Sequence, residues 1–453
     1  MLTLSQSLAL VIFLVMFLAI VFGKGHRYVP ALIGAILVVV VVFLGVMKST
    51  SAVTDVLNLE SLTHVRFWMP GKEHVESHGV NWQTVIFIGG MMVMVEGLGE
   101  VGFFRWLCLL IAKAVKYRVV PIFITFMLLS GFLSMFIDSI TVLLFLAAVT
   151  IELARLLKID PVPLIIAEIF AANVGGSATM SGDPPNIIIG TAFGYTFTDF
   201  IKNTGLIAWV GMAVAVIYFY LCFRKSLRAS QDALENTTAH YPEPKEAIIN
   251  PLLFKIDVSI FILVIILLIT HAESGLSVAL IGCIAAALTL ITATKRAPHI
   301  IRKVDWRTLI FFIGLFICVG GLEETGALKR LAEYIGEVSG GNLVLVVSII
   351  LWLSAFASAI VDNIPFSATM VPVISNLAQT AGFNLPTLSW ALALGTDIGG
   401  NATPIGASAN VVGTAIAERE GYRISWGRFM KYALPGMLIV VGVCHLLLIL
   451  LHT

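Results

Sequence analysis

Long apolar runs, without the polar interruptions that a soluble helix needs, dominate the hydrophobic pattern of this chain. An apolar run of about 20 residues crosses the hydrocarbon core of a bilayer as a helix. The pattern therefore predicts an all-α, polytopic membrane protein. Spans are expected at residues 7–23, 30–47, 82–98, 206–223, 256–271, 277–294, 308–322 and 433–451. The first run lacks a basic leading region and a small-residue cleavage site, so it is expected to remain as a helix.

The chain also carries an internal repeat. Residues 82–190 match residues 306–414 at a constant offset of 224 positions. A register held over so long a segment indicates a duplicated unit. The clearest block pairs Gly175, Gly176, Ala178, Thr179, Gly182 and Asn186 with Gly399, Gly400, Ala402, Thr403, Gly406 and Asn410.

Each half is expected to form five transmembrane helices and one re-entrant helical hairpin. An odd number of crossings inverts the second half, as in many secondary transporters built from inverted repeats. The loop at 48–81 is expected to be irregular. The predicted units are a first repeat at 1–223 with a hairpin at 119–157 and a broken helix at 161–195, a linker at 224–254, and a second repeat at 255–453 with a hairpin at 343–380 and a broken helix at 386–420.

The distribution of charge supports this arrangement. Only 12% of residues are charged, against roughly 25% in soluble domains. Short cytoplasmic loops are enriched in Lys and Arg, and an outside N-terminus places most of the 28 basic residues on one face. Both termini are thus expected outside a plasma or inner membrane, with the linker in the cytoplasm. The exceptions are Lys48, Arg66, Lys72, Lys202, Lys329 and Arg330.

Two glycine-rich breaks, at 175–186 and 399–410, interrupt the apolar pattern. Backbone in hydrocarbon must hydrogen-bond internally, so such segments persist only where they contact protein or line a cavity. Exposed carbonyl groups there favour a cation, and exposed N–H groups favour an anion. The breaks and the two hairpin tips are therefore expected to meet near the bilayer midplane as one ion and solute site.

Acidic residues at membrane depth are costly and are functional candidates. No Lys or Arg lies in the same motifs, so H⁺ or Na⁺ is the expected partner, and no other cofactor is indicated. The repeat is asymmetric, because Asp183 aligns with Ala407 and Asn173 aligns with Asp397. The acidic candidates are Asp138, Glu168, Asp183, Asp362 and Asp397, and Na⁺ is expected near all of these except Glu168.

Helix capping is the competing interpretation of these residues. Asp138 and Asp362 could simply cap the second hairpin helices, and Asp183 followed by Pro184 fits a cap with proline at the first helical position. The asparagines Asn186, Asn363 and Asn410 could hydrogen-bond between helices instead of binding an ion. Capping and ion binding can coexist in one residue.

Enzyme signatures are missing from the sequence. There is no GxxxxGK[ST] motif for ATP and no HExxH or GxSxG motif for a hydrolase. The chain is therefore not expected to be an enzyme, and an ion gradient or the membrane potential is the expected energy source. A separate ATPase subunit stays open as a partner. No basic stripe interleaved with aromatic residues indicates nucleic acid.

The motifs at 171–186, 359–366 and 399–418 resemble those of the ion transporter superfamily. They are similar to the arsenite permease and sodium–proton antiporter (ArsB/NhaD) group, and most closely to its P-protein-like branch. The resemblance implies a homodimer with a scaffold and a mobile transport domain that moves like an elevator. Relatives often carry asparagine where this chain has Ser139.

The same resemblance, added to the acidic residues above, defines the predicted binding residues. Together they predict an H⁺- or Na⁺-coupled secondary transporter of a small inorganic ion, oxyanion or metalloid, with arsenite-type efflux favoured. A Na⁺/H⁺ antiporter and an uncoupled anion channel are the alternatives. The predicted site residues are Asp138, Ser139, Thr141, Asn173, Thr179, Gly182, Asp183, Pro184, Asn186, Asp362, Asn363, Pro365, Asp397, Thr403, Gly406, Ser408 and Asn410.

Overall fold

The structure is a computed structural model that describes residues 3–23, 25–71, 79–234, 241–339 and 341–453. Within these ranges every regular element is a helix. Nine of the described helices are long and apolar enough to cross a membrane. The predicted all-α polytopic fold is therefore confirmed, while the inverted orientation of the two repeats stays a prediction.

The first half runs from the N-terminus to a long helix that leads toward the middle of the chain. Its elements are α1 (Leu4–Phe22), α2 (Tyr28–Leu37), η1 (Val38–Met47), α3 (Thr50–Leu57), η2 (Glu60–Thr63), α4 (Val65–Trp68), α5 (Trp82–Glu100), α6 (Phe103–Ala114), α7 (Val119–Ser134), α8 (Ser139–Leu157), α9 (Val162–Gly176), α10 (Pro184–Phe193), α11 (Phe197–Phe200), η3 (Ile201–Gly205) and α12 (Leu206–Leu234).

The second half repeats this order of long and short helices. Its elements are η4 (Pro244–Ala247), α13 (Pro251–Ser274), α14 (Val278–Ala293), η5 (Thr294–Arg296), α15 (Ala297–Lys303), α16 (Trp306–Glu324), α17 (Ala327–Ser339), α18 (Leu343–Ile360), α19 (Asn363–Ala381), α20 (Leu385–Gly399), η6 (Gly400–Ala402), α21 (Ser408–Arg419) and α22 (Trp426–His452).

The sequence repeat is visible in these boundaries. Helices α16, α17, α18 and α19 each begin 224 positions after α5, α6, α7 and α8. The caps repeat as well: Asn81 accepts a hydrogen bond from the Thr84 amide, and Asp305 accepts one from the Thr308 amide. A polar cap satisfies an amide that would otherwise lack a partner at the start of each span.

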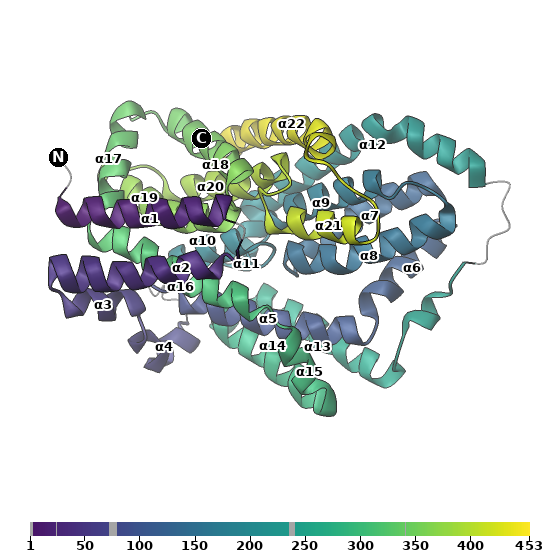
Figure 1. The fold of residues 1–453 in the computed structure, drawn as a ribbon, viewed down its shortest axis with the longest axis horizontal. Helices are drawn as coiled ribbons and strands as arrows, with labels where there is room; N and C mark the ends of the chain where they lie inside the picture. Colours follow the sequence, from purple (N-terminus) through teal and green to yellow (C-terminus); the bar gives the residue numbers. More distant parts are fainter. Residues whose placement is uncertain (1–2, 24, 72–78, 235–240, 340) are drawn as a thin grey trace.

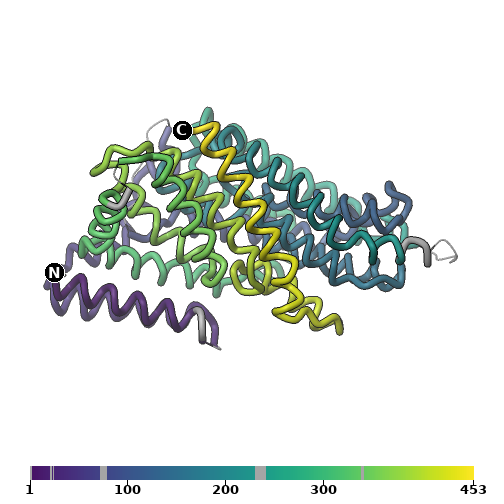
Figure 2. The backbone as a smooth tube through the Cα atoms, turned by 90° about the horizontal axis from the view of Figure 1, so that it is seen from above, coloured from purple at the N-terminus to yellow at the C-terminus, as the bar shows by residue number. Residues whose placement is uncertain are grey.

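The helices form two groups (Figure 1). In one, α5 packs against α14 and α2 packs against α16; in the other, α7 packs against α9 and α18 packs against α20. We call these groups the frame and the core. The N-terminal helices α1 and α2 run along one edge of the molecule, as Figure 2 shows. The candidate site lies in the core, where the helices break.

Glycine pairs bring the backbones of neighbouring helices into contact in both groups. A Cβ atom at Gly90 of α5 would overlap the carbonyl oxygen of Gly282 in α14, and one at Gly175 of α9 would overlap that of Gly131 in α7. Small residues allow such close approach, which drives helix packing where lipid is as apolar as the side chains. The second of these contacts, between Gly175 and Gly131, holds the broken helix α9 against the first hairpin.

Two segments differ from the sequence predictions. The loop at 48–81 is not irregular in its described part, because it contains α3, η2 and α4; Ser49 caps α3 by accepting from the Ala52 amide. The linker at 224–254 begins as a helical continuation of α12, which ends at Leu234. Short polar caps and a run of good helix formers explain both, and apolar periodicity alone does not reveal them. Residues 72–78 and 235–240 lie outside the described ranges.

Candidate functional site

Two helix breaks form the centre of the site. The first lies between the end of α9 at Gly176 and the start of α10 at Pro184; the second lies between the end of α20 at Gly399 and the start of α21 at Ser408. Both fall at the predicted glycine-rich segments. Each break leaves carbonyl groups without helical partners, and these must be satisfied locally.

The same side chains brace both breaks. The Asn186 amide donates to the carbonyl oxygens of Gly176 and Thr179, at 3.0 Å each. The Asn410 amide donates to those of Gly400, at 2.8 Å, and Thr403, at 2.7 Å. These asparagines act as hydrogen-bonding braces through their nitrogen atoms. The Asn186 side-chain oxygen accepts no hydrogen bond among the described residues, whereas the Asn410 oxygen accepts one from Asn173.

Threonine hydroxyl groups join each break to the neighbouring hairpin. Thr179 donates to the Met135 carbonyl and Thr403 to the Ala359 carbonyl, both at 2.5 Å. Gly182 and Gly406 are needed where the chain folds back, because a Cβ atom there would overlap carbonyl oxygens of the same break and of the adjacent hairpin. These four residues shape the site, and their role in binding stays a prediction.

The hairpin tips carry aspartates that cap their second helices. Asp138 accepts from the Thr141 amide at 3.0 Å and from the Thr141 hydroxyl at 2.6 Å, which occupies both carboxylate oxygens. Asp362 accepts from the Ile364 amide at 3.2 Å. The capping interpretation therefore describes part of both residues' contacts. Pro365 follows in the first turn of α19 and offers no side-chain hydrogen bond.

Asp183 does not use its side chain as a cap, although it precedes α10. Instead, the Ser139 hydroxyl donates to Asp183 Oδ1 at 2.5 Å, which links the first hairpin tip to the first break. The second carboxylate oxygen of Asp183 has no hydrogen-bond donor among the described residues. The side chain is almost wholly buried, and Pro184 has no amide hydrogen to offer.

The second half reverses this arrangement. There the hydroxyl of Ser408, at the start of α21, donates to Asp362 Oδ2 at the hairpin tip, at 2.7 Å. Arg27, the residue before α2, forms an ion pair with the same Asp362 oxygen and donates to the Ser408 hydroxyl at 2.9 Å. The expectation that no basic residue would neutralise the acidic residues is wrong for Asp362. No local pattern indicates this contact, because Arg27 lies outside the motif of Asp362, 335 positions away.

A buried row of amide groups joins the two halves on one side of the site. Asn173 of α9 donates to the side-chain oxygens of both Asn401 and Asn410, at 2.9 Å each. All three residues are fully buried. Asn401, in η6, is a site residue that was not predicted from the sequence. The one feature that could have indicated it is its polar side chain within the second break.

Asp397 occupies the position equivalent to Asn173 and has a different environment. It lies in α20, is fully buried, and faces Asn186, Asn363 and Asp183. Neither of its carboxylate oxygens has a hydrogen-bond donor within the described part of the chain. The Asn186 oxygen and the second Asp183 oxygen likewise have none there. We call Asp183, Asn186 and Asp397 the acceptor cluster.

The acceptor cluster has the chemistry of a site for a hard cation. A buried carboxylate without a partner costs so much free energy that it must take up a proton or a cation. Carboxylate and amide oxygens suit hard ions, whereas softer metals prefer sulfur or imidazole. Among the described residues no group of three or more His, Cys, Asp or Glu side chains could hold a metal ion. Two carboxylates and one amide are oxygen groups of the kind that can hold Na⁺ or H⁺, and the identity of the ion stays a prediction.

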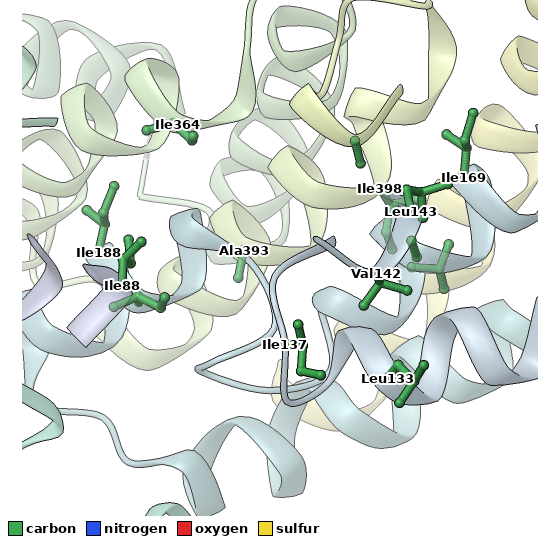
Figure 3. Close-up of a cluster of buried hydrophobic side chains, with 14 of the residues drawn as sticks. Ile88, Leu133, Ile137, Val142, Leu143, Ile169, Ile188, Ile364, Ala393 and Ile398 are labelled. Atoms are coloured by element: carbon green, nitrogen blue, oxygen red, sulfur yellow. The ribbon is translucent and has the colours of Figure 1, made fainter. Parts of the chain in front are cut away.

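Buried aliphatic side chains lie next to the polar groups in the sequence. Ile137, from the turn between α7 and α8, Val142 of α8 and Ile398 of α20 are almost fully buried, and Figure 3 shows them among other aliphatic side chains. Apolar surroundings lower the local dielectric and strengthen electrostatic interactions within them. Glu168 of α9 lies apart from the cluster, where it accepts from the Thr150 hydroxyl at 2.7 Å.

Known proteins resemble this chain over most of its length. An uncharacterized transporter of Mycobacterium bovis is 35% identical over 356 residues, which cover 78% of this chain and 82% of that protein. The mouse P protein is 28% identical over 515 aligned positions, which cover 95% of this chain but only 58% of that protein. The similarity to the P protein agrees with the resemblance drawn from the motifs, while the assignment to the ArsB/NhaD group stays a prediction.

Solved structures with a similar fold are also transporters. The YdaH transporter of Alcanivorax borkumensis matches with a TM-score of 0.56 at 13% identity, covering 98% of this chain and 97% of that one. MtrF of Neisseria gonorrhoeae, described among antimetabolite efflux pumps, matches with a TM-score of 0.53 at 12% identity, covering 100% and 95%. At such low identity these matches show the fold alone. The citrate transporter family CitMHS matches residues 17–395, so this chain is a multi-pass membrane transporter that belongs to that family.

Proposed function

We propose that this protein is a secondary active transporter that couples the movement of a small anion to Na⁺ or H⁺ bound at the acceptor cluster. One observation carries the proposal: no hydrogen bond of ordinary geometry reaches either carboxylate oxygen of the wholly buried Asp397 among the described residues, and it lies beside Asp183, whose second carboxylate oxygen is also unpaired there. A bound cation would neutralise these groups in the low-dielectric core. The electrochemical gradient of that cation would then drive transport of the anion across the membrane.

The proposed solute is a small inorganic or organic oxyanion. The description of the family as citrate transporters supports an anion. The guanidinium of Arg27 beside the second hairpin tip supports it as well. Arsenite-type efflux stays a prediction from the motifs, and the assay below includes arsenite for that reason.

The proposed movement carries the core, with its hairpins and broken helices, past the frame. Two features support it. The site lies on the core helices, and the ion pair between Arg27 and Asp362 is a polar contact that joins the second tip to the frame. A homodimer held through the frame would keep the frame still, in keeping with the predicted elevator. Chemical crosslinking of the purified protein in lipid tests the dimer.

Proteoliposome flux tests the coupling. Purified protein is reconstituted with labelled citrate, phosphate or arsenite, and uptake is measured under an imposed Na⁺ gradient, an imposed pH gradient, or neither. Saturable uptake that follows one of the cation gradients supports the proposal. The Asp397→Asn variant should lose this uptake. Asp160→Asn, which removes an exposed ion pair with Arg428, is the matched control and should keep it.

Two outcomes would contradict the proposal. Anion current that follows voltage alone, without saturation, would identify an uncoupled anion channel. Proton movement driven by Na⁺ without any solute would identify a Na⁺/H⁺ antiporter. The second alternative has its own support in the pairing of Asp183 with Asp397, because two neighbouring carboxylates can bind either ion in turn.

A further inference from the structure

A cavity opens at the ends of α2 and α16, beside the second hairpin tip. Its volume is about 350 Å³, and its lining includes His26, Arg27, Arg307, Thr308 and Ser408. This is enough room for a small polyanion. The acceptor cluster belongs to the core, whereas most of this lining comes from the frame.

Two arginines, Arg27 and Arg307, line the cavity together with one acidic residue. Arg27 is paired with Asp362, but Arg307 has no carboxylate partner among the described residues; its guanidinium lies 3.5 Å from the His26 ring. The acidic residue of the lining, Asp305, is engaged as the cap of α16, where it accepts from the Thr308 amide and hydroxyl. An arginine without an acidic partner beside a second arginine is typical of a site for a carboxylate or phosphate group.

The pair formed by Arg27 and Asp362 connects this cavity to the acceptor cluster. The Arg27 side chain is one-third exposed, whereas the Asp362 side chain is 2% exposed. The charge of Asp362 also acts on Asp183, more weakly than that of Asp138. While Arg27 neutralises Asp362, that carboxylate contributes little charge to the cluster. Once the pair separates, its full negative charge faces Asp183.

We propose that a small oxyanion binds in this cavity between Arg27 and Arg307 by displacing Asp362 from Arg27, and that the freed Asp362 charge then strengthens cation binding at Asp183 and Asp397. The inference rests on the proposed function and supplies its coupling step. Because coupling between two binding sites is reciprocal, the cation strengthens anion binding by the same factor. The Ser408 hydroxyl contacts both Arg27 and Asp362. When Arg27 binds the anion in place of Asp362, we expect this hydroxyl to hydrogen-bond to the anion.

Two substitutions should have opposite effects. Arg27→Gln removes the anion's partner and leaves Asp362 permanently free, so citrate binding weakens about tenfold or more while Na⁺ binding tightens. Asp362→Asn keeps an oxygen to cap α19 but removes the charge, so citrate binding tightens and no longer depends on Na⁺. A purely structural role for the pair would weaken both ligands in both variants.

The experiment measures binding to the detergent-purified protein by titration calorimetry. Citrate, phosphate and arsenate are each titrated with and without Na⁺, and proton uptake on citrate addition is followed in weak buffer for the case of H⁺ coupling. Arg428→Gln, which removes an exposed arginine paired with Asp160, is the matched control and should leave all affinities unchanged. The opposite shifts described above support the proposal.

Three results would overturn it. One is binding of none of the three anions to the wild-type protein. Another is a shift of citrate and cation affinity in the same direction in Arg27→Gln. The third is binding of phosphatidylglycerol in nanodiscs, lost in Arg27→Gln, without binding of the soluble anions, which would make the cavity a lipid site. In each case, cation-coupled flux of the wild-type protein in proteoliposomes would show that the proposed function survives.

Discussion

The two helix breaks share one architecture and differ in charge. In both, an asparagine braces the break and a threonine joins it to the hairpin, with the same bonds 224 positions apart. Equivalent residues of the two halves contact the opposite half: Asn173 in the first half and Asp397 in the second. Asn173 supplies the donors that its neighbours need, whereas Asp397 adds two more acceptors. The duplicated fold thus contains one half-site in which amide groups of the two halves hydrogen-bond to one another and one in which the carboxylate oxygens of Asp397 accept no hydrogen bond among the described residues.

Asp397→Asn should have the largest effect on this comparison. The amide is neutral and can donate to Asn186 or Asp183, so the second half-site would complete itself like the first. Losing a buried charge partner typically costs ~3–5 kcal/mol, and cation-coupled flux should therefore fall about 100-fold or more. The melting temperature without Na⁺ should stay equal or rise, and stabilisation by Na⁺ should disappear. A variant that keeps its Na⁺-dependent stabilisation would place the cation elsewhere.

Asn173→Asp makes the reverse change and places a carboxylate in the half-site that has an amide. The new carboxylate cannot donate to the oxygens of Asn401 and Asn410, and it would be fully buried. We expect a loss of ~2–3 kcal/mol in unfolding free energy, the cost of a buried polar group without its partner. Thermal melts with and without Na⁺ measure it, and partial rescue by Na⁺ would show that a second cation site has formed. Asn173→Gln, which keeps the donor, serves as control.

The serine hydroxyls give a smaller contrast. Ser139→Ala removes the hydroxyl that donates to Asp183, and the loss should be ~1–2 kcal/mol of stability. Ser408→Ala should cost less, because Asp362 keeps Arg27 as a partner. Chemical denaturation of the two variants measures the difference. Equal effects would mean that Arg27 does not support Asp362.

Exposed ion pairs should matter least. Arg105→Gln breaks the pair with Glu152, whose nearest atoms lie 2.6 Å apart on the molecular surface. Such pairs contribute ~0–1 kcal/mol, and both stability and flux should stay within that range of the wild-type protein. A large loss of flux in this variant would show that charge outside the two half-sites takes part in transport.

The repeat register was sufficient to predict where the helices break. Glycine, threonine and asparagine at matching positions in both halves indicated the segments that the structure shows as non-helical. The sequence could not predict which buried polar atoms would find hydrogen-bond partners. This depends on contacts between the two halves, such as the hydrogen bond from Asn173 to Asn401. The same limit hid Arg27: a contact between positions 335 apart leaves no local pattern. Sequence alone also could not decide between capping and binding for Asp183, since that choice depends on where the Ser139 hydroxyl points.

Contacts between the two halves determine when the site can assemble during synthesis. Asp397 contributes to a cluster whose other members, Asp183 and Asn186, are synthesised more than 200 residues earlier. Contacts of such long sequence separation form late. During synthesis, Asp183 and Asn186 are therefore inserted well before Asp397, and the acceptor cluster assembles only once α20 has joined the first half. A nascent chain that stops before α20 would lack the proposed cation site.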